Sequence, residues 1–182
     1  GVLLYLNREK ELPGFTSYAV VRLYDSPEFI RRHLFDVASD EKAKITFYLS
    51  ASGFFTLSVI DIRGEPYTPE AKAGRDGIPI DDFIVLFCEV GVSDKATIMR
   101  IVVNDKEVAR REILLPLNLG KMDWKPISVG TLRTKGAPPP DPNGRTAAFL
   151  LMELAFYSKM IRETDQHKLL EYARQKHKLP FD

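Results

Sequence analysis

The 182-residue sequence has a single cysteine, Cys88, and no Asn-x-Ser/Thr glycosylation sequon. One thiol excludes an internal disulfide and any zinc site built from several cysteines. Secreted domains of this size can fold without disulfides, so the count is only mild support for a reducing compartment. We expect Cys88 to be an inert thiol of the core, because it lies in the apolar run of residues 83–90.

The sequence also lacks an excess of one charge and a long apolar run. Its 26 basic residues face 25 acidic residues, a formal net charge of +1, so nothing indicates a nucleic-acid partner or a polyacid ligand. No charge-poor stretch is long enough for a membrane span. Residues 2–6 are apolar but too short for a signal peptide. With 45% hydrophobic and 28% charged residues, the composition predicts one soluble, folded domain over residues 1–182.

What the sequence has in abundance is short β-type runs separated by turn residues. Turn chemistry at Ser52-Gly53 and at Asn104-Asp105-Lys106 predicts two hairpins. Alternation in residues 54–62 places Phe55, Leu57 and Val59 on one face. In all, eight or nine strands are expected, over residues 15–24, 45–50, 54–62, 83–90, 96–103, 107–115, 127–132 and 147–157.

Four other segments do not follow this strand pattern plainly. Residues 63–82 and 134–145 are rich in proline and glycine, which predicts two long loops. Residues 162–177 have apolar side chains at one-turn spacings and predict a helix whose solvated face is basic and whose other face covers a sheet. Ser26-Pro27 is a good helix start, but residues 30–37 read equally as a strand, so both interpretations stay open at this point.

Many strands with one late helix are typical of an antiparallel sandwich. Several phrases of the sequence resemble concanavalin A-like, laminin-G-like jelly-roll domains. The phrases that carry the resemblance are residues 15–23, 34–39, 45–49, 55–59, 101–108, 127–130, 152–157 and 160–165. The resemblance implies an all-β, two-sheet antiparallel jelly-roll β-sandwich with a short C-terminal helix, and a strand for residues 30–37. It favours an extracellular or cell-surface location, while the single cysteine leaves the cytoplasm open.

The same superfamily includes glucan hydrolases, which need two carboxylates about 5 Å apart. The hydrolase relatives place two glutamates around an aspartate on one strand. Here only Asp61 fits, because Val59 stands at the nucleophile position and Arg63 and Gly64 at the acid/base positions. No acidic pair matches the calcium site of calcium-binding relatives. We therefore expect no enzyme activity, no metal and no cofactor.

The histidines do not form a cluster in the sequence. His33 stands alone, and His167 and His177 lie ten residues apart on the predicted helix, too far apart to share a metal through one helical turn. We expect the two helix histidines to be solvated. No Gly-x-Ser-x-Gly elbow and no glycine-rich phosphate loop is present.

Two classes of function remain. The first is a non-catalytic module, part of a larger protein, that binds a carbohydrate or a protein partner. The second is a structural or interaction domain with no small ligand. Trp124 is either a platform for a sugar or an anchor at the sandwich edge, and the loop over residues 137–145 is either a ligand rim or a plain connection. No oligomeric state is predicted. The candidate binding residues are Arg75, Asp76, Asp81, Asp82, Trp124, Asp141, Asn143 and Arg145.

Overall fold

The computed structural model describes residues 12–23, 32–39, 42–50, 54–64, 70–73, 79, 82–120, 122–129 and 149–179. For residues 122–129 and a few strand ends only the backbone is described. In this part of the chain there are ten strands and one helix. They are β1 (Leu12–Leu23), β2 (Arg32–Ser39), β3 (Lys44–Leu49), β4 (Phe55–Ile60), β5 (Glu70–Ala73), β6 (Phe83–Val92), β7 (Thr97–Val103), β8 (Lys106–Ile113), β9 (Met122–Val129), β10 (Phe149–Met160) and α1 (Glu163–His177).

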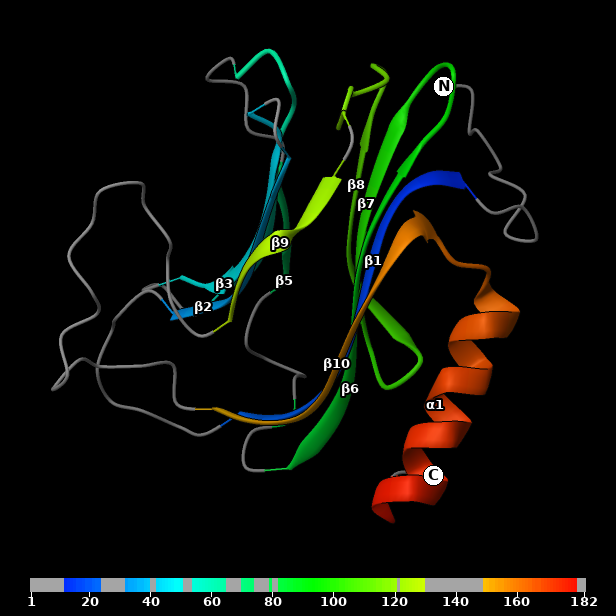
Figure 1. Ribbon diagram of the computed structural model, residues 1–182. Helices are drawn as coiled ribbons and strands as arrows, with labels where there is room; N and C mark the ends of the chain where they lie inside the picture. The colour runs from blue at the N-terminus through cyan, green and yellow to red at the C-terminus, as the bar shows by residue number, and fades with distance from the viewer. Residues whose placement is uncertain are drawn as a thin grey trace, which may run out of the picture.

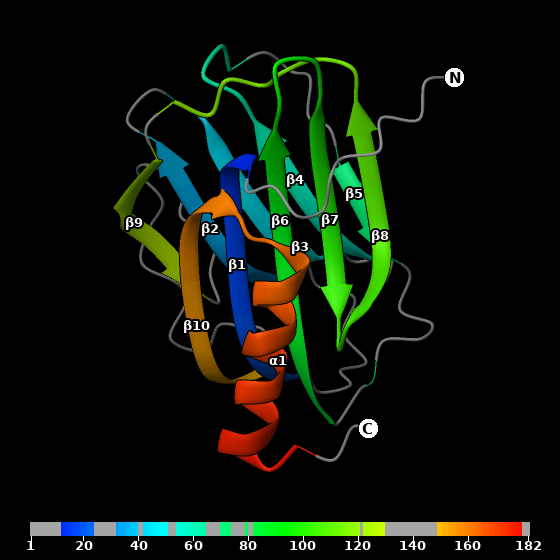
Figure 2. The ribbon, with the colours of Figure 1, turned by 90° about the vertical axis from the view of Figure 1, so that its right-hand side faces the viewer.

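The strands form two five-stranded sheets, and every pairing is antiparallel. Sheet A has the order β10-β1-β6-β7-β8, and sheet B has the order β5-β4-β3-β2-β9. Figure 1 shows the two sheets face to face, with α1 as a third layer on the outside of sheet A. Turning the molecule places α1 in front of β10, β1 and β6 (Figure 2). The predicted jelly-roll β-sandwich with a C-terminal helix is confirmed.

The core lies between the sheets and is built from alternate residues of each strand. Phe55, Leu57 and Val59 of β4 point into it, as their alternation predicts. Aromatic rings link the layers: the Phe15 ring of sheet A lies 5.8 Å from the Phe35 ring of sheet B, centroid to centroid. Burial of these apolar faces is the main force that holds the two sheets together.

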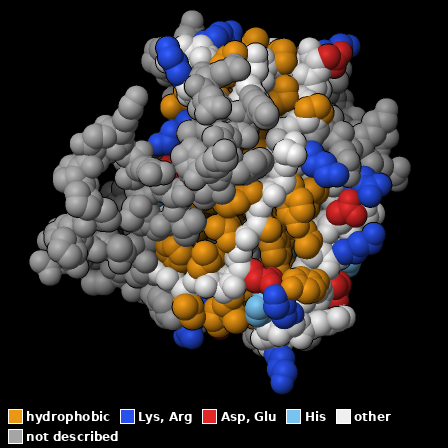
Figure 3. Space-filling view, in the orientation of Figure 1, with side chains coloured by type: hydrophobic (Ala, Val, Ile, Leu, Met, Phe, Trp, Pro, Cys, Tyr) orange, Lys and Arg blue, Asp and Glu red, His pale blue; other side chains and the backbone are white. Residues whose placement is uncertain are grey.

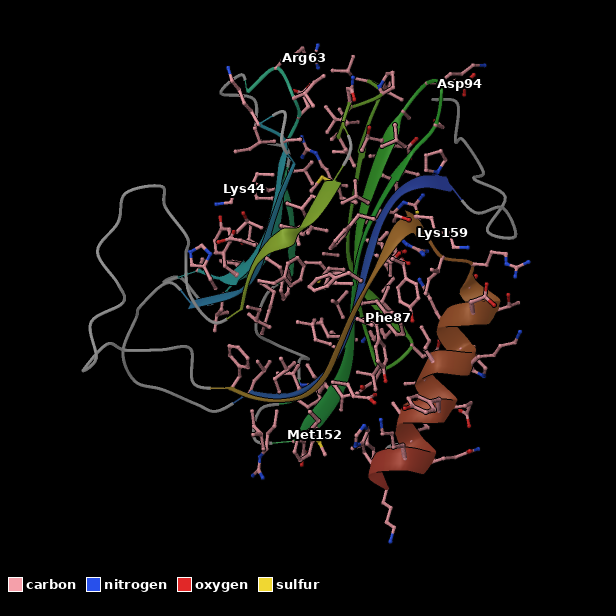
Figure 4. The ribbon with its side chains drawn as sticks, viewed as in Figure 1. Lys44, Arg63, Phe87, Asp94, Met152 and Lys159 are labelled. Carbon is pink, nitrogen blue, oxygen red and sulfur yellow. The ribbon has the colours of Figure 1, made fainter. Side chains whose placement is uncertain are left out.

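The other face of sheet A is covered by α1. β6 is buried on both sides, as its continuous apolar sequence predicts: Leu86 enters the core, while Phe87 packs beneath the helix with Leu170 and Ala173. Figure 4 shows Phe87 between the sheet and α1. The helix ends at His177, and Lys178 closes it with a left-handed φ of 52°.

The turn between β7 and β8 contains two residues rather than the three expected. Asn104 and Asp105 have φ values of 48° and 77°, as a type I′ turn requires, and Lys106 already belongs to β8. The Asn104 side-chain Oδ1 also accepts a hydrogen bond from the Val85 amide at 2.8 Å. This bond fixes the hairpin against β6.

Three further expectations are decided by the described residues. The strand interpretation of residues 30–37 is right, because β2 runs from Arg32 to Ser39. The predicted loop over 63–82 contains β5, a short strand that the sequence did not predict. β9 begins at Met122 rather than at residue 127, so Trp124 lies inside a strand and not before one. The predicted turn at 51–53 and the loop at 134–145 lie outside the described residues.

Candidate ligand-binding face

The outer face of sheet B carries polar side chains. Phe35, Phe47 and Leu57 fill the core, so the residues that alternate with them farther along β2, β3 and β4 point away from it. A register shift between His33 and Phe35 interrupts the alternation on β2, and His33 lies outside the core. Most of these outward side chains are nevertheless buried. We call this set the sheet B face: His33 and Asp36 of β2, Lys44, Thr46 and Tyr48 of β3, Thr56 and Ser58 of β4, and Glu70 of β5.

Asp36 is the central charge of the sheet B face and is only 3% exposed. Its Oδ1 lies 3.4 Å from the Lys44 Nζ, and its Oδ2 lies 3.9 Å from the His33 Nδ1. Neither oxygen accepts a hydrogen bond from any residue that the structure describes. A buried carboxylate without donors is costly, and in native proteins each such group calls for an explanation.

Two aromatic rings lie beside this carboxylate. The ring of Tyr48, which pairs with His33 across the β2–β3 ladder, has its centroid 5.4 Å from that of His33. The Tyr48 hydroxyl donates a hydrogen bond to the Glu70 Oε1 at 3.2 Å, which ties β3 to β5. The face thus combines a carboxylate, an ammonium group and two rings. Lys44 is 27% exposed and connects the cluster to the surface. Figure 4 shows it on the side of the molecule opposite α1.

A buried carboxylate on the other outer face is fully satisfied. Glu89 of β6 accepts hydrogen bonds from Arg100 Nε at 2.9 Å, from Gln166 Nε2 at 2.5 Å and from Thr16 Oγ1 at 3.4 Å. Burial raises the pKa of Glu89, against the opposing effect of Arg100 and these bonds. Gln166 belongs to α1, so the cluster attaches the start of the helix to sheet A.

A second cluster attaches the end of the helix. Glu153 of β10 accepts hydrogen bonds from the hydroxyls of Tyr18, at 2.9 Å, and Tyr172, at 3.1 Å, and also from Lys176. Burial would raise the pKa of Glu153, but these bonds outweigh it and hold the pKa at about 2. The His177 Nε2 lies 3.3 Å from the Glu153 Oε2. His177 is therefore largely buried against β10, so its predicted solvation is wrong, whereas His167 is exposed as predicted.

The structure describes only two of the residues predicted for binding. Asp82 is exposed immediately before β6, in sheet A. Trp124 lies in β9, between the positions where Asp123 pairs with Ala38 and Ser128 pairs with Asp36. The pairing of β9 with β2 thus brings Trp124 close to the sheet B face, while Asp82 precedes a strand of the other sheet. The others lie outside the described residues: Arg75, Asp76, Asp81, Asp141, Asn143 and Arg145.

Of the residues of the sheet B face, only His33 is noted from the sequence, as one of three histidines that do not cluster. Asp36 and Lys44 are eight positions apart, and only the β2–β3 pairing brings their charges together. The available signal was a charged residue between the two core residues Phe35 and Val37, on a strand with an apolar inner face. Such a position points away from the core by geometry alone.

The residues tested for hydrolysis are placed as the sequence predicts. Val59, at the nucleophile position, is completely buried in the core. Asp61 accepts hydrogen bonds from the Arg63 backbone amide at 3.0 Å and from its Nε at 2.6 Å, so both oxygens are engaged. Cys88 is a core thiol, and burial raises its pKa, which keeps it protonated.

The described residues contain neither a metal-ligand cluster nor a membrane-spanning helix. No group of three or more His, Cys, Asp or Glu side chains in this part of the chain is arranged to hold a metal ion. In the same residues, α1 is too short and too polar to cross a bilayer, and no other helix qualifies.

Comparison with known proteins identifies the fold. No protein-family model and no curated protein sequence matches the chain. Among solved structures, the sialidase CBM40 of Ruminococcus gnavus with α2,3 sialyllactose has a TM-score of 0.59 at 10% identity, over 87% of this chain and 83% of that chain. The chain has the β-sandwich fold of lectin-like domains.

Two further structures show the same sandwich. A SAP-like pentraxin from Limulus polyphemus has a TM-score of 0.55 at 10% identity, over 85% of this chain and 68% of that one. The receptor-binding domain of botulinum neurotoxin mosaic serotype C/D has a TM-score of 0.62 at 10% identity, over 88% of this chain but 37% of that chain. At these identities the likeness is one of fold.

Proposed function

We propose that this chain is a non-catalytic, concanavalin A-like module that binds a glycan on the sheet B face. The observation that carries the proposal is the Asp36 carboxylate, which is buried on an outer face and accepts no hydrogen bond from the described residues. Sugar hydroxyls are donors of the kind that this carboxylate lacks. A bound sugar would therefore satisfy a group that the described chain leaves unsatisfied.

The neighbours of Asp36 fit the same class of ligand. The Lys44 ammonium group can donate to sugar oxygens. The rings of His33 and Tyr48, both buried, form an apolar part of the face next to which the apolar side of a sugar ring could pack. Since Lys44 is the partly exposed member of the cluster, we infer that a ligand enters along its side chain.

Two of the similar structures support a glycan ligand. The Ruminococcus gnavus module was solved with sialyllactose bound. A structure of botulinum neurotoxin type C has a TM-score of 0.57 at 11% identity over 88% of this chain. Cell entry of that toxin depends on interaction with two ganglioside molecules. An extracellular or cell-surface location, as part of a larger protein, would suit such a ligand. Trp124 of β9, together with Asp141 and Asn143, is proposed as the rim of the same site.

A glycan array, read with and without calcium, tests the function. The strongest hit is then titrated by calorimetry against the parent chain, Asp36→Asn and the control Asp94→Asn, whose carboxylate is exposed between β6 and β7. We expect Asp36→Asn to weaken binding about tenfold or more, since a lost charged hydrogen bond is worth about 1.5–3 kcal/mol. The control should bind like the parent chain.

Each part of the proposal can fail separately. No hit on the array would instead favour an interaction domain without a small ligand. If a glycan binds and Asp36→Asn does not change its affinity, the proposed function stands but the sheet B face is not the binding site. In that case the triple alanine variant at Trp124, Asp141 and Asn143 decides whether the loops bind the glycan.

A further inference from the structure

Strand β2 contains a bulge just before Asp36. The register of the β2–β3 ladder shifts between His33 and Phe35, which makes Leu34 an extra residue on β2. Leu34 and Phe35 both lie in the core, although consecutive residues of a regular strand point to opposite faces. As a result, His33 and Asp36 share the outer face of sheet B, which in a regular strand they would not. Bulges of this kind often re-aim a side chain at a functional site.

The re-aimed His33 ring lies beside a carboxylate that accepts no hydrogen bond from the described residues. Its Nδ1 is 3.9 Å from the Asp36 Oδ2, which is beyond hydrogen-bond distance, and both side chains are more than nine-tenths buried. A neutral imidazole carries one N–H group, whereas an imidazolium carries two and a positive charge. Proton uptake by His33 therefore guarantees a donor at Nδ1 and draws the ring towards the carboxylate, because opposite charges attract strongly where water is excluded.

The other charged and titratable side chains described around this pair come from β3 and β5. Lys44 of β3, whose Nζ is 3.4 Å from the Asp36 Oδ1, opposes a positive charge on His33. Tyr48 of β3 contacts the His33 ring and donates a hydrogen bond to Glu70 of β5. β9, which pairs with β2 at Asp36, is described by its backbone. Among the described side chains, two carboxylates that favour a charged His33 thus stand against one ammonium group.

We propose that His33 is a pH switch for the sheet B face. At neutral pH the Asp36 carboxylate accepts hydrogen bonds from the glycan, and at acidic pH the protonated His33 donates to that carboxylate in place of the glycan. The inference rests on the function proposed for this face. Imidazole is the side chain that ordinarily gains its proton between about pH 5 and 8. Because the proton and the glycan compete for the same carboxylate, glycan binding weakens as the pH falls.

Histidine titration by NMR tests the coupling without any glycan. The imidazole signals of His33, His167 and His177 are followed from about pH 5 to pH 8, and the His33 signal is the one lost in His33→Gln. Asp36→Asn should move the midpoint of the His33 titration down by about 1 pH unit or more, because it removes a neighbouring opposite charge. Asp94→Asn, which removes an exposed carboxylate between β6 and β7, should leave the midpoint unchanged.

Calorimetry at two pH values tests the switch itself. The probe is the strongest hit of the glycan array, titrated at about pH 7.5 and about pH 5.5, where the imidazole changes charge. The parent chain should bind it about tenfold more weakly at the lower pH, since one competing proton can weaken binding by at most about tenfold per pH unit. His33→Gln should bind it equally at both pH values, because an amide does not titrate in this range.

His167→Gln is the matched control for the loss of a histidine. His167 is exposed on α1, and the histidine surface visible in Figure 3 lies on the α1 side of the molecule, away from sheet B. This variant should show the same weakening at the lower pH as the parent chain. If it also loses the pH dependence, His33 is not the switch.

The remaining outcomes separate this inference from the function on which it rests. A His33 midpoint that does not move in a folded Asp36→Asn variant overturns the switch. A glycan bound equally or more tightly at the lower pH also overturns it, but leaves the proposed function standing. No binding at about pH 7.5 removes the proposed function, and the switch with it. If Asp36→Asn does not fold, the parent chain decides: saturation with the array hit should lower the His33 midpoint, and an unmoved midpoint overturns the switch.

Discussion

The two outer faces of the sandwich each contain a buried carboxylate, but they treat it in opposite ways. On sheet A, Glu89 accepts hydrogen bonds from β1, from β7 and from α1. On sheet B, Asp36 accepts none from the described residues, and its oxygens lie 3.4 Å from the Lys44 ammonium and 3.9 Å from the His33 ring nitrogen. A carboxylate that its own chain satisfies serves the fold, whereas one left without donors is available to a ligand.

The basic partners of these two carboxylates also differ in how deeply they are buried and how closely they bind. The Arg100 side chain is buried, and its Nε and an amino group both donate to one Glu89 oxygen. Lys44 is partly exposed, and its 3.4 Å distance to Asp36 is a looser contact. Water can therefore compensate Lys44 for the loss of its partner, but it cannot reach Arg100 in the same way.

The largest effect should follow from Glu89→Gln. The substitution keeps the shape of the side chain but takes from the buried Arg100 its nearer counter-charge and leaves only Glu107, 3.7 Å away, and breaking such a buried pair typically costs about 3–5 kcal/mol. Urea denaturation measures the free energy of unfolding. The control is Glu171→Gln on the exposed side of α1, with an expected loss below about 1 kcal/mol. A loss for Glu89→Gln as small as that of the control would mean that the pair does not hold the helix.

A smaller but clear effect should follow from Leu170→Ala. Leu170 is almost completely buried between α1 and sheet A, and removing three carbons from such a site costs about 2–5 kcal/mol. Relative to the parent chain, Leu170→Ala should speed the exchange of backbone amide hydrogens more in α1 than in β3 and β4. Leu114→Ala, at a leucine that is 78% exposed, should change stability by less than about 0.5 kcal/mol. Equal losses in the two variants would show that α1 does not depend on this contact.

The fold was predictable because its signals are local. Alternation in Phe55, Leu57 and Val59 names the core face of β4, and Asn104-Asp105 supplies the left-handed residues of a hairpin. β5 and the start of β9 were missed for the opposite reason. Pro126 and the charges around it break the strand pattern, and only pairing with β2 makes that stretch a strand. That residues 1–182 form one domain stays a prediction.

The candidate site was less predictable because it depends on contacts across strands. Asp36 and Lys44 meet through the β2–β3 ladder, which no spacing in the sequence reveals. His177 shows the same limit. Its place on a helix predicted solvation, but its acidic neighbour, Glu153, comes from β10. The eight residues predicted for binding were chosen from loops and from the only tryptophan, and their role stays a prediction.

The Glu153 cluster should make stability depend on pH. The folded pKa of about 2 lies below the ordinary value of 4.5, so the unfolded chain binds the proton more tightly. The stability from this group is complete above about pH 4.5 and is lost as the pH falls towards 2, with a slope of at most about 1.4 kcal/mol per pH unit. The free energy of unfolding, measured by denaturation at several pH values in this range, should depend less on pH in Glu153→Gln than in the parent chain. An unchanged slope would show that other carboxylates account for it.

The smallest effect on stability should come from Asp36→Asn, the same chemical change as Glu89→Gln on the opposite face. No hydrogen bond to the carboxylate is lost among the described residues, and Lys44 can remain hydrated. Relief of a buried charge offsets the weakened ion pair, so we expect a change within about 1 kcal/mol. Denaturation of both variants under identical conditions gives the comparison directly. If Asp36→Asn unfolds as readily as Glu89→Gln, Asp36 supports the fold, and the argument for a ligand at the sheet B face is lost.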